Sequence, residues 1–282
     1  MKNLTVRMRI KSLYRDMSSK EKLIADYVLD NIKKVSRSSI SEISSELGLA
    51  DSTFFQFSRK LGYNGFKDFK IALLTEEFDP EISIHEKISS SDSEVTIIEK
   101  VFDASVKAIE DTKKIIDFDT YKSAVNLMIN SNRVTFFGLG GSNAVALDSY
   151  HKFLRSPIPV NYASDSHIQI MNASLLTSKD CAFVISHTGT SIEALKIANL
   201  VKENKAKLIV LTSYPLSPLA KLADVVLISC SEETTYRSES LSSRLSQLSV
   251  IDALFVTIMF KNGKKSNESL KKIRKAISNT KE

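Results

Sequence analysis

Apolar residues in the first 77 positions recur every three or four residues, which predicts helices and no strands. Ser18 or Ser19, followed by Glu21, is typical of a helix start with a serine N-cap and an acid in the first turn. Gly48 and Gly62 are expected to end two later helices. The apolar faces of the four predicted helices are Ile24, Tyr27, Val28 and Ile32; Ile40, Ile43 and Leu47; Phe54, Phe57 and Leu61; and Phe66, Phe69 and Leu73. Residues 1–77 are therefore predicted to form an all-α bundle.

A different pattern follows a polar segment rich in Ser, Asp and Pro. A helical pattern then runs from Val95 to Ile109, so residues 78–120 are predicted to be a linker and a connecting helix. Over residues 121–262, short runs rich in β-branched residues alternate with amphipathic helices, which predicts βαβ units around a parallel sheet of about five strands. The predicted strands are Val134–Phe137, Ile158–Val160, Cys181–Ile185, Leu208–Leu211 and Val225–Ile228.

The composition is that of a folded protein. Of the 282 residues, 43% are hydrophobic and 26% are charged, which excludes collagen-like, low-complexity and wholly disordered chains. No apolar run reaches the roughly 18 residues of a membrane span, and the N-terminus lacks the apolar stretch of a signal peptide. We therefore expect a soluble cytoplasmic protein with no membrane partner. Two cysteines, Cys181 and Cys230, are too few for a disulfide framework or a cysteine-built metal site.

Charge is distributed unevenly along the chain. Residues 1–77 carry 14 basic against 10 acidic residues, residues 78–260 carry 17 against 21, and residues 261–282 carry 8 against 2. Residues 263–282 form a basic C-terminal tail with helical spacing of its apolar positions. Two basic ends around an acidic middle are a weak signature of a nucleic-acid partner. The alternative is a pair of solvated, lysine-rich surfaces.

Residues 40–59 have the spacing of a helix-turn-helix. Ser44 is small where the two helices must approach closely, and Gly48 falls in the turn, where glycine most easily adopts a positive φ. The outer face of the second helix would then enter the major groove of DNA, with lysines beyond it on phosphates. The residues assigned to this contact are Ser52, Thr53, Gln56, Arg59, Lys60 and Lys67, with Lys70 as a further phosphate candidate. An ordinary helical bundle with a polar face is the alternative.

Two predicted strands open through loops suited to phosphate. Residues 134–143 give a strand, the turn Gly138-Leu-Gly140-Gly141 and a helix start at Ser142, where backbone N–H groups and a hydroxyl bind anions. A dinucleotide fingerprint would need glycine at position 143, which is Asn143, and an acid ending the second strand. These departures argue against NAD.

The second loop, residues 186–191, holds hydroxyl groups and no Lys or Arg. It suits a phosphomonoester held by hydroxyls, N–H groups and a helix dipole, while simple helix capping is the alternative. Two such loops on neighbouring strands are stronger evidence than one, because ligands bind at the carboxyl ends of strands in open α/β sheets. The residues assigned to this site are Gly140, Ser142, Ser186, Thr188, Gly189, Thr190 and Ser191.

These loop motifs, Gly138-x-Gly140-x-Ser142 and Ser186-His-Thr188-Gly-Thr190, resemble the sugar isomerase (SIS) domain, a phosphosugar-binding three-layer α/β sandwich. Residues 21–27 and 60–70 resemble the helix-turn-helix domain of the RpiR/MurR family of bacterial transcriptional regulators. The resemblance implies a DNA-binding regulator of carbohydrate metabolism that senses a sugar phosphate, with Glu239 near the sugar ring. It also implies a homodimer or homotetramer through the SIS domain. Gln56 stands where the family usually has Arg, and Ala50-Asp51 where it usually has Ser.

Related SIS domains include isomerases and lyases, so an enzyme with a helical appendage is the alternative function. Isomerisation needs a general base within hydrogen-bond reach of the substrate. The candidates are Glu239, His151, His167 and His187, with Arg237 as an anion partner. A lone histidine is more often a core or surface residue than a catalyst, and no metal-ligand cluster or serine nucleophile stands out. The sequence therefore predicts a regulator with no catalytic residues, no cofactor and no metal.

Overall fold

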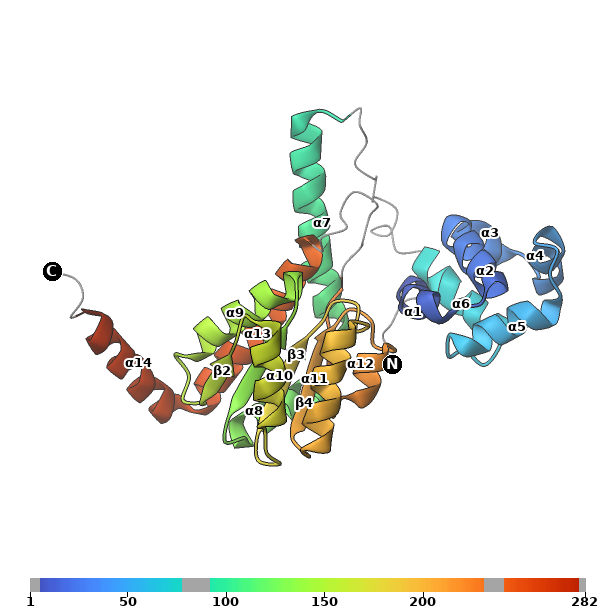
Figure 1. Cartoon of the computed structure of the whole chain (residues 1–282). Coiled ribbons are helices and arrows are strands. Elements are labelled where there is room, and N and C mark those ends of the chain that lie inside the picture. Colours follow the sequence, from blue (N-terminus) through green and yellow to red (C-terminus); the bar gives the residue numbers. More distant parts are fainter. Residues whose placement is uncertain (1–5, 78–91, 231–240, 279–282) are drawn as a thin grey trace. The chain divides into compact units, whose positions relative to one another are not determined.

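The computed structural model describes residues 6–77, 92–230 and 241–278 (Figure 1). Contacts between Cα atoms divide the chain into two compact units, Met1–Lys87 and Ile88–Glu282. Each unit has its own buried core of apolar side chains. The two units are described separately below.

The first unit is helical throughout its described residues. Its elements are α1 (Val6–Leu13), the 3-10 turn η1 (Tyr14–Asp16), α2 (Ser19–Asp30), α3 (Ile32–Arg37), α4 (Ile40–Glu46), α5 (Asp51–Lys60) and α6 (Phe66–Glu77). Ser18 caps α2 in a capping box with Glu21, as the sequence predicts, and Ser39 caps α4 in the same way with Glu42. The core is aromatic: Phe54 and Phe57 are fully buried and meet Phe69 edge to face.

Two features of this unit differ from the sequence prediction. The helix pattern from Ile24 to Ile32 is broken at Asn31, where the backbone leaves the helical region and α3 begins. Helix α1 was not predicted, because its apolar face, Val6, Ile10 and Leu13, lies within a basic run. Val6 and Ile10 are fully buried in the core, and Leu13 packs against it.

The second unit contains a five-stranded, all-parallel sheet in the order β2-β1-β3-β4-β5. The strands are β1 (Val134–Gly138), β2 (Val160–Tyr162), β3 (Cys181–Ile185), β4 (Lys207–Thr212) and β5 (Val225–Ile228). The predicted sheet is confirmed, with one shift: the second strand begins at Val160 rather than Ile158. Pro159 has no N–H to donate to a ladder, and Val160 is the residue that pairs with Val134.

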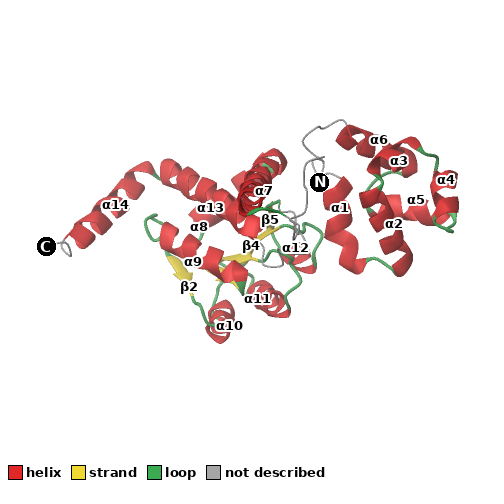
Figure 2. Cartoon of the chain, turned by 90° about the horizontal axis from the view of Figure 1, so that it is seen from above, coloured by secondary structure: helices red, strands yellow, loops and turns green. Residues whose placement is uncertain are grey.

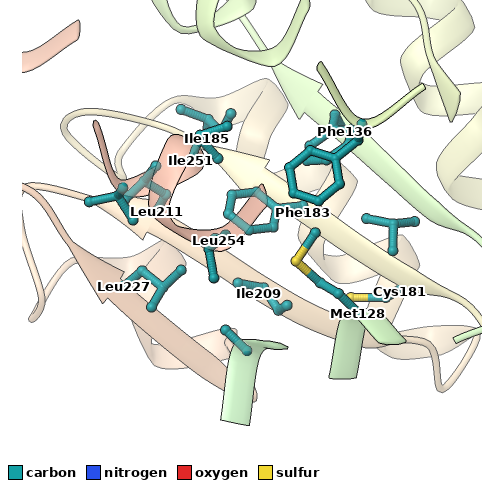
Figure 3. Close-up of a cluster of buried hydrophobic side chains, with 14 of the residues drawn as sticks. Met128, Phe136, Cys181, Phe183, Ile185, Ile209, Leu211, Leu227, Ile251 and Leu254 are labelled. Atoms are coloured by element: carbon teal, nitrogen blue, oxygen red, sulfur yellow. The ribbon is translucent and has the colours of Figure 1, made fainter. Parts of the chain in front are cut away.

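Helices cover both faces of the sheet, so the unit is the expected three-layer sandwich (Figure 2). One layer holds α8 (Phe118–Asn130), α9 (Gly141–Phe153) and α13 (Leu241–Lys261); the other holds α10 (Ser166–Ser174), α11 (Ile192–Glu203) and α12 (Pro218–Leu222). Successive strand residues point to opposite layers: Phe183 packs with α8 and α13, and Val184 packs with α10 and α11. Figure 3 shows the first of these cores, a cluster that includes Phe136 and Phe183 of the sheet and Ile251 and Leu254 of α13.

Two further helices flank the sandwich. Helix α7 (Glu94–Ile115) packs along α13, and α14 (Gly263–Ser278) continues from the end of α13. Among the described residues, one stretch of α13, Ser243–Lys261, is long and apolar enough to cross a membrane by length and composition. Its residues Val250, Ile251, Leu254 and Ile258 are buried in the core, as expected of a core helix, which passes the same test.

Candidate functional sites

Helices α4 and α5 form the helix-turn-helix that the sequence predicts. Gly48 lies in the turn with φ of +64°, and the N–H of Leu49 donates to the carbonyl of Ser44 at 2.8 Å. Ser44 is buried where the two helices approach each other, and Ile43 packs into the same core as Phe54. The turn is thus closed by backbone geometry that a β-carbon at position 48 would oppose.

The outer face of α5 carries Ser52, Gln56 and Arg59, all exposed, while Thr53 is half-buried. Within the described residues, the side chains of Gln56 and Arg59 make no hydrogen bond or ion pair. Lys67, near the start of α6, is also exposed. These residues remain available to an external partner.

Lys60 differs from the other predicted DNA contacts because its ammonium is already bonded within the domain. It donates to both carboxylate oxygens of Glu21, at 3.0 and 2.9 Å, and to the carbonyl of Asp16 at 3.0 Å. Partial burial favours the neutral form of Glu21, but hydrogen bonds from Lys60 and Ser18 outweigh it and lower the pKa of this carboxyl. Lys70 is likewise held, on the carbonyl of Ser38.

Sequence reasoning missed Phe55. This side chain is 43% exposed, whereas Phe54 and Phe57 on the same helix are fully buried. Its ring lies over Gly65, where an added Cβ would come within 2.8 Å of the ring atom Cε2. It lines an open groove with Ile40, Phe66 and Ile71 among other residues. The sequence did contain a signal: Phe55 comes three residues after Ser52 and four before Arg59, so it lies on the same helix face as these two polar residues.

In the second unit, both predicted ligand loops lie at the carboxyl edge of the sheet, after the adjacent strands β1 and β3. The first loop turns at Gly140, with φ of +54°, and leads into α9. A Cβ on Gly138 would lie 2.4 Å from the carbonyl oxygen of Ser142, so the strand end and the helix start pack without room for a side chain. This close approach brings the N-terminus of α9 onto the edge of the sheet.

Gln169 of α10 holds this loop and was not predicted. Its side-chain amide donates to the carbonyl of Gly138 at 2.9 Å and accepts from the N–H of the same residue at 3.2 Å. Gln169 is fully buried. On the neighbouring strand, the hydroxyl of Tyr162 donates to the side chain of Asn143 at 2.9 Å. Asn143, which stands where a dinucleotide fingerprint would have glycine, therefore joins α9 to β2.

The second loop is held by backbone and hydroxyl contacts. Gly189 has φ of +63°, and a Cβ there would lie 2.1 Å from the hydroxyl oxygen of Ser217, so only glycine fits. The N–H of Gly189 donates to the hydroxyl of Ser186 at 3.2 Å. The backbone N–H of Ser186 in turn donates to the carbonyl of Leu211 at 3.0 Å.

The predicted hydroxyl ligands differ in the hydrogen bonds that they already make within the protein. Ser186 accepts a bond, so its proton can still be donated. Ser142 is half-buried, and no hydrogen bond of its hydroxyl to another described residue is found. Thr188 and Thr190 bond to each other at 3.0 Å.

Ser191 already uses its hydroxyl as the N-cap of α11. It accepts from the N–H of Ala194 at 3.3 Å and donates to the carboxylate of Glu193 at 2.8 Å. The backbone N–H of Glu193 and this hydroxyl together lower the pKa of the Glu193 carboxyl. The capping alternative thus describes part of what Ser191 does.

Of the candidate catalytic groups, only His187 is buried among the described residues. The ring of His187 is buried edge to face against Tyr214, with ring centres 5.5 Å apart. His151 and His167 are exposed. Burial raises the pKa of the Cys181 thiol to about 12, which keeps it protonated and unreactive. Glu239 and Arg237 lie outside the described residues, and among those described no group of three His, Cys, Asp or Glu could hold a metal.

Comparison with known proteins finds the same two kinds of domain, a helix-turn-helix domain and a SIS domain. The family described as "Helix-turn-helix domain, rpiR family" matches residues 4–79, and the SIS domain matches residues 127–257. An uncharacterized HTH-type transcriptional regulator of Thermotoga maritima is 36% identical over 99% of this chain and 100% of its own length. The HTH-type transcriptional regulator HexR of Escherichia coli is 30% identical over 95% of this chain and 93% of its own. The chain belongs to the RpiR family of transcriptional regulators.

Solved structures share the fold. The Vibrio vulnificus NanR protein complexed with ManNAc-6P superposes with a TM-score of 0.63 over 97% of this chain and 98% of its own, at 22% identity. The sugar isomerase domain of an RpiR transcription factor from Sphaerobacter thermophilus gives 0.59 over 64% of this chain and 98% of its own, at 18% identity.

The resemblance to an RpiR-type helix-turn-helix domain and a SIS domain, drawn from sequence motifs, is confirmed by these matches. The enzyme alternative is set aside, because relatives that align over nearly the whole chain are transcriptional regulators. The RpiR-family chain is thus a DNA-binding regulator whose second domain has the architecture of a sugar-phosphate site.

Proposed function

We propose that this regulator binds a double-stranded operator through α5 and senses a sugar phosphate at the carboxyl edge of its SIS domain. The observation that carries the proposal is the adjacency of two glycine-hydroxyl loops on the neighbouring strands β1 and β3. Each loop leads into the N-terminus of a helix of at least 12 residues. Helix dipoles and backbone N–H groups there favour a phosphate dianion.

The phosphate fits the second loop best. Residues 186–191 carry several hydroxyl groups and no Lys or Arg, and Gly189 lets a ligand approach the backbone. Ser142 reaches the same edge from the other loop. The proposed ligand set is Gly140, Ser142, Ser186, Thr188, Gly189, Thr190 and Ser191, with Glu239 on the sugar hydroxyls. The bound ManNAc-6P of the Vibrio NanR structure belongs to the same chemical class.

The operator contact is assigned to the outer face of α5 and the start of α6. Ser52, Thr53 and Gln56 face the bases, while Arg59, Lys60 and Lys67 serve phosphates. Lys60 would have to leave Glu21 to do so.

We further propose that the protein is a cytoplasmic homodimer or homotetramer assembled through the SIS domain, as symmetric operator half-sites require. Helix α7 precedes the SIS domain but belongs to the same compact unit, and it supports an assembly of this unit: five of its apolar residues form one exposed stripe, namely Val95, Ile98, Phe102, Val106 and Ile109. Phe102 alone is 67% exposed. Phe102→Glu is expected to lower the mass measured by light scattering, and an unchanged mass would assign the assembly to another face.

The central test uses the full chain, a fluorescent duplex from the region upstream of its own gene, and a panel of hexose and pentose phosphates. One sugar phosphate is expected to shift the DNA affinity. Ser142→Ala and Ser186→Ala should each weaken that effector about 10- to 100-fold, the value of a hydrogen bond to a charged group. DNA affinity without effector should be unchanged.

Ser174→Ala supplies a matched control. Ser174 ends α10, and its carbonyl accepts a hydrogen bond from Asn204, which shortly precedes β4. This places Ser174 at the opposite edge of the sheet from the two ligand loops. This variant should respond as the wild type does. A wild-type response that survives both Ser142→Ala and Ser186→Ala would place the effector elsewhere.

A further inference from the structure

The outer face of α5 is not wholly polar. Ser52, Phe55, Gln56 and Arg59 follow the spacing i, i+3, i+4, i+7, which places them in one stripe along the helix. The stripe therefore contains a large aromatic side chain, 43% exposed, between polar neighbours. Contact of the exposed part of this ring with an apolar group would remove apolar surface from water and so favour binding.

The ring is also held in place. Its Cε2 edge lies over Gly65, where no side chain intervenes, and Phe66 lines the same groove. A ring supported from behind presents its remaining edge without an ordering cost. Phe55 is thus a fixed apolar contact on the face that the helix-turn-helix turns toward DNA.

The major groove offers one apolar group with a fixed position, the C5-methyl of thymine. The partner of thymine, adenine, offers N6 and N7, which a glutamine amide can bond with two hydrogen bonds. Gln56 directly follows Phe55, is exposed, and makes no side-chain hydrogen bond within the described residues. Adjacent residues of α5 therefore carry the two complementary groups that distinguish an A·T pair.

We propose that Phe55 and Gln56 together read A·T base pairs in each operator half-site, Phe55 on a thymine methyl and Gln56 on adenine N6 and N7. This inference rests on the proposed DNA contact of α5 and adds the bases that it recognises. The Gln56 amide cannot reproduce the bidentate bond of an arginine to guanine, so this stripe favours A·T over G·C where the family usually places Arg.

The test begins with selection of duplexes from a random library by the full-length protein. At each thymine of the selected half-site, deoxyuridine then replaces thymine and removes the methyl group alone. The wild type is expected to lose about fourfold in affinity at one position, the equivalent of one buried methyl group. Replacing the critical adenine with 7-deazaadenine, which lacks the N7 acceptor, should also weaken wild-type binding.

The variants separate the two side chains. Phe55→Ala should bind more weakly and become insensitive to deoxyuridine, while Gln56→Ala should become insensitive to 7-deazaadenine. Phe55→Leu retains an apolar side chain and keeps the test available if Phe55→Ala unfolds. Ile71→Ala is the matched control: it alters the same groove from α6, and it should keep the full sensitivity to deoxyuridine.

Two outcomes would overturn the inference: specific binding in which no thymine of the half-site is sensitive to loss of its methyl group, or Phe55→Ala keeping that sensitivity. Failure to select any sequence at all is a different result, since it would count against the proposed operator contact of α5 itself.

Discussion

Thr112 joins α7 to the carboxyl edge of the sheet, the edge proposed above to bind the ligand, through the backbone of Cys230. Its hydroxyl accepts the N–H of Cys230 at 2.8 Å and donates to the carbonyl of Ala108 at 2.7 Å, and it is buried. Cys230 follows β5 at the carboxyl edge, where the ligand loops also lie. Helix α7 is the element by which the chain enters this unit from the DNA-binding domain. The bond therefore links the ligand edge to the connecting helix.

Thr112→Val should uncouple the two domains. Valine keeps the shape but leaves the buried N–H of Cys230 without an acceptor, which costs about 1–3 kcal/mol of folding stability. We expect a lower melting temperature and a reduced effect of sugar phosphate on DNA affinity, measured as the ratio of Kd values with and without effector. Thr112→Ser, which keeps the hydroxyl, should retain the effect. A full response in Thr112→Val would show that the signal leaves by another route.

Gln169→Glu tests whether the clamp on Gly138 shapes the phosphate loop. An ionised glutamate cannot donate to the Gly138 carbonyl, so one of the two buried bonds is lost. We expect lower thermal stability and at least tenfold weaker effector binding by calorimetry, with DNA affinity in the absence of effector unchanged. Gln169→Met removes both polar contacts and should bind the effector at least as weakly as Gln169→Glu does. If effector affinity stays at the wild-type value in a folded Gln169→Glu protein, the loop holds its shape without the clamp.

Much of this architecture could be predicted because its signals are local. Ser18 with Glu21, Gly48, and the β-branched runs from Val134 to Ile228 each determine their own element within a few residues. Phe55 shows the limit of such reasoning. A phenylalanine in a helix with three of them is normally assigned to the core, and which of the three stays exposed depends on the face of α5 that packs against Phe69 in the folded domain.

The contacts that sequence reasoning missed join residues far apart in the chain. Gln169 and Gly138 are 31 positions apart, and Thr112 and Cys230 are 118 apart. Gln169 gave one usable signal: it is a polar residue four positions before the buried Ala173, on the apolar face of a helix. Thr112 gave none, because threonine is common on helices and its acceptor role depends on the position of β5.

Asp224 should make stability depend on pH. Partial burial would raise its pKa, but the N–H of Leu208 at 2.8 Å and the ammonium of Lys202 at 3.0 Å outweigh this, and the net pKa lies below the ordinary value. A depressed folded pKa means that the stabilisation is present above the unfolded value, about 3.9, and is lost as pH falls through the folded pKa. Asp224→Asn should therefore melt at a lower temperature than the wild type at pH 7.

The difference between the two melting temperatures should begin to shrink near pH 4, where the carboxyl of the unfolded wild type takes up a proton, and should shrink further as pH falls through the lower folded pKa. Asp119→Asn is the control, because Asp119 is almost fully exposed and its contact with Lys122 is long, at 3.5 Å. A difference that stays constant from pH 7 to pH 3 would attribute the effect of Asp224→Asn to packing rather than to charge.

Glu21 holds the ammonium of Lys60, a residue that we propose as a DNA contact. In the free protein the Lys60 ammonium is bonded to Glu21 and to the carbonyl of Asp16, so a phosphate contact requires that ion pair to break. Glu21→Gln removes the charge yet keeps a side-chain oxygen for the N–H of Ser18, so the cap of α2 is retained. We expect DNA affinity to rise a few-fold. The slope of log Kd against log salt should also steepen by about 0.9, the value of one added phosphate contact. Glu21→Gln could strengthen binding by releasing Lys60 or by removing a negative charge, and the double variant Glu21→Gln/Lys60→Gln separates these causes. If Lys60 is responsible, the double variant should lose the added slope. A slope that persists would attribute the stronger binding to the removed negative charge.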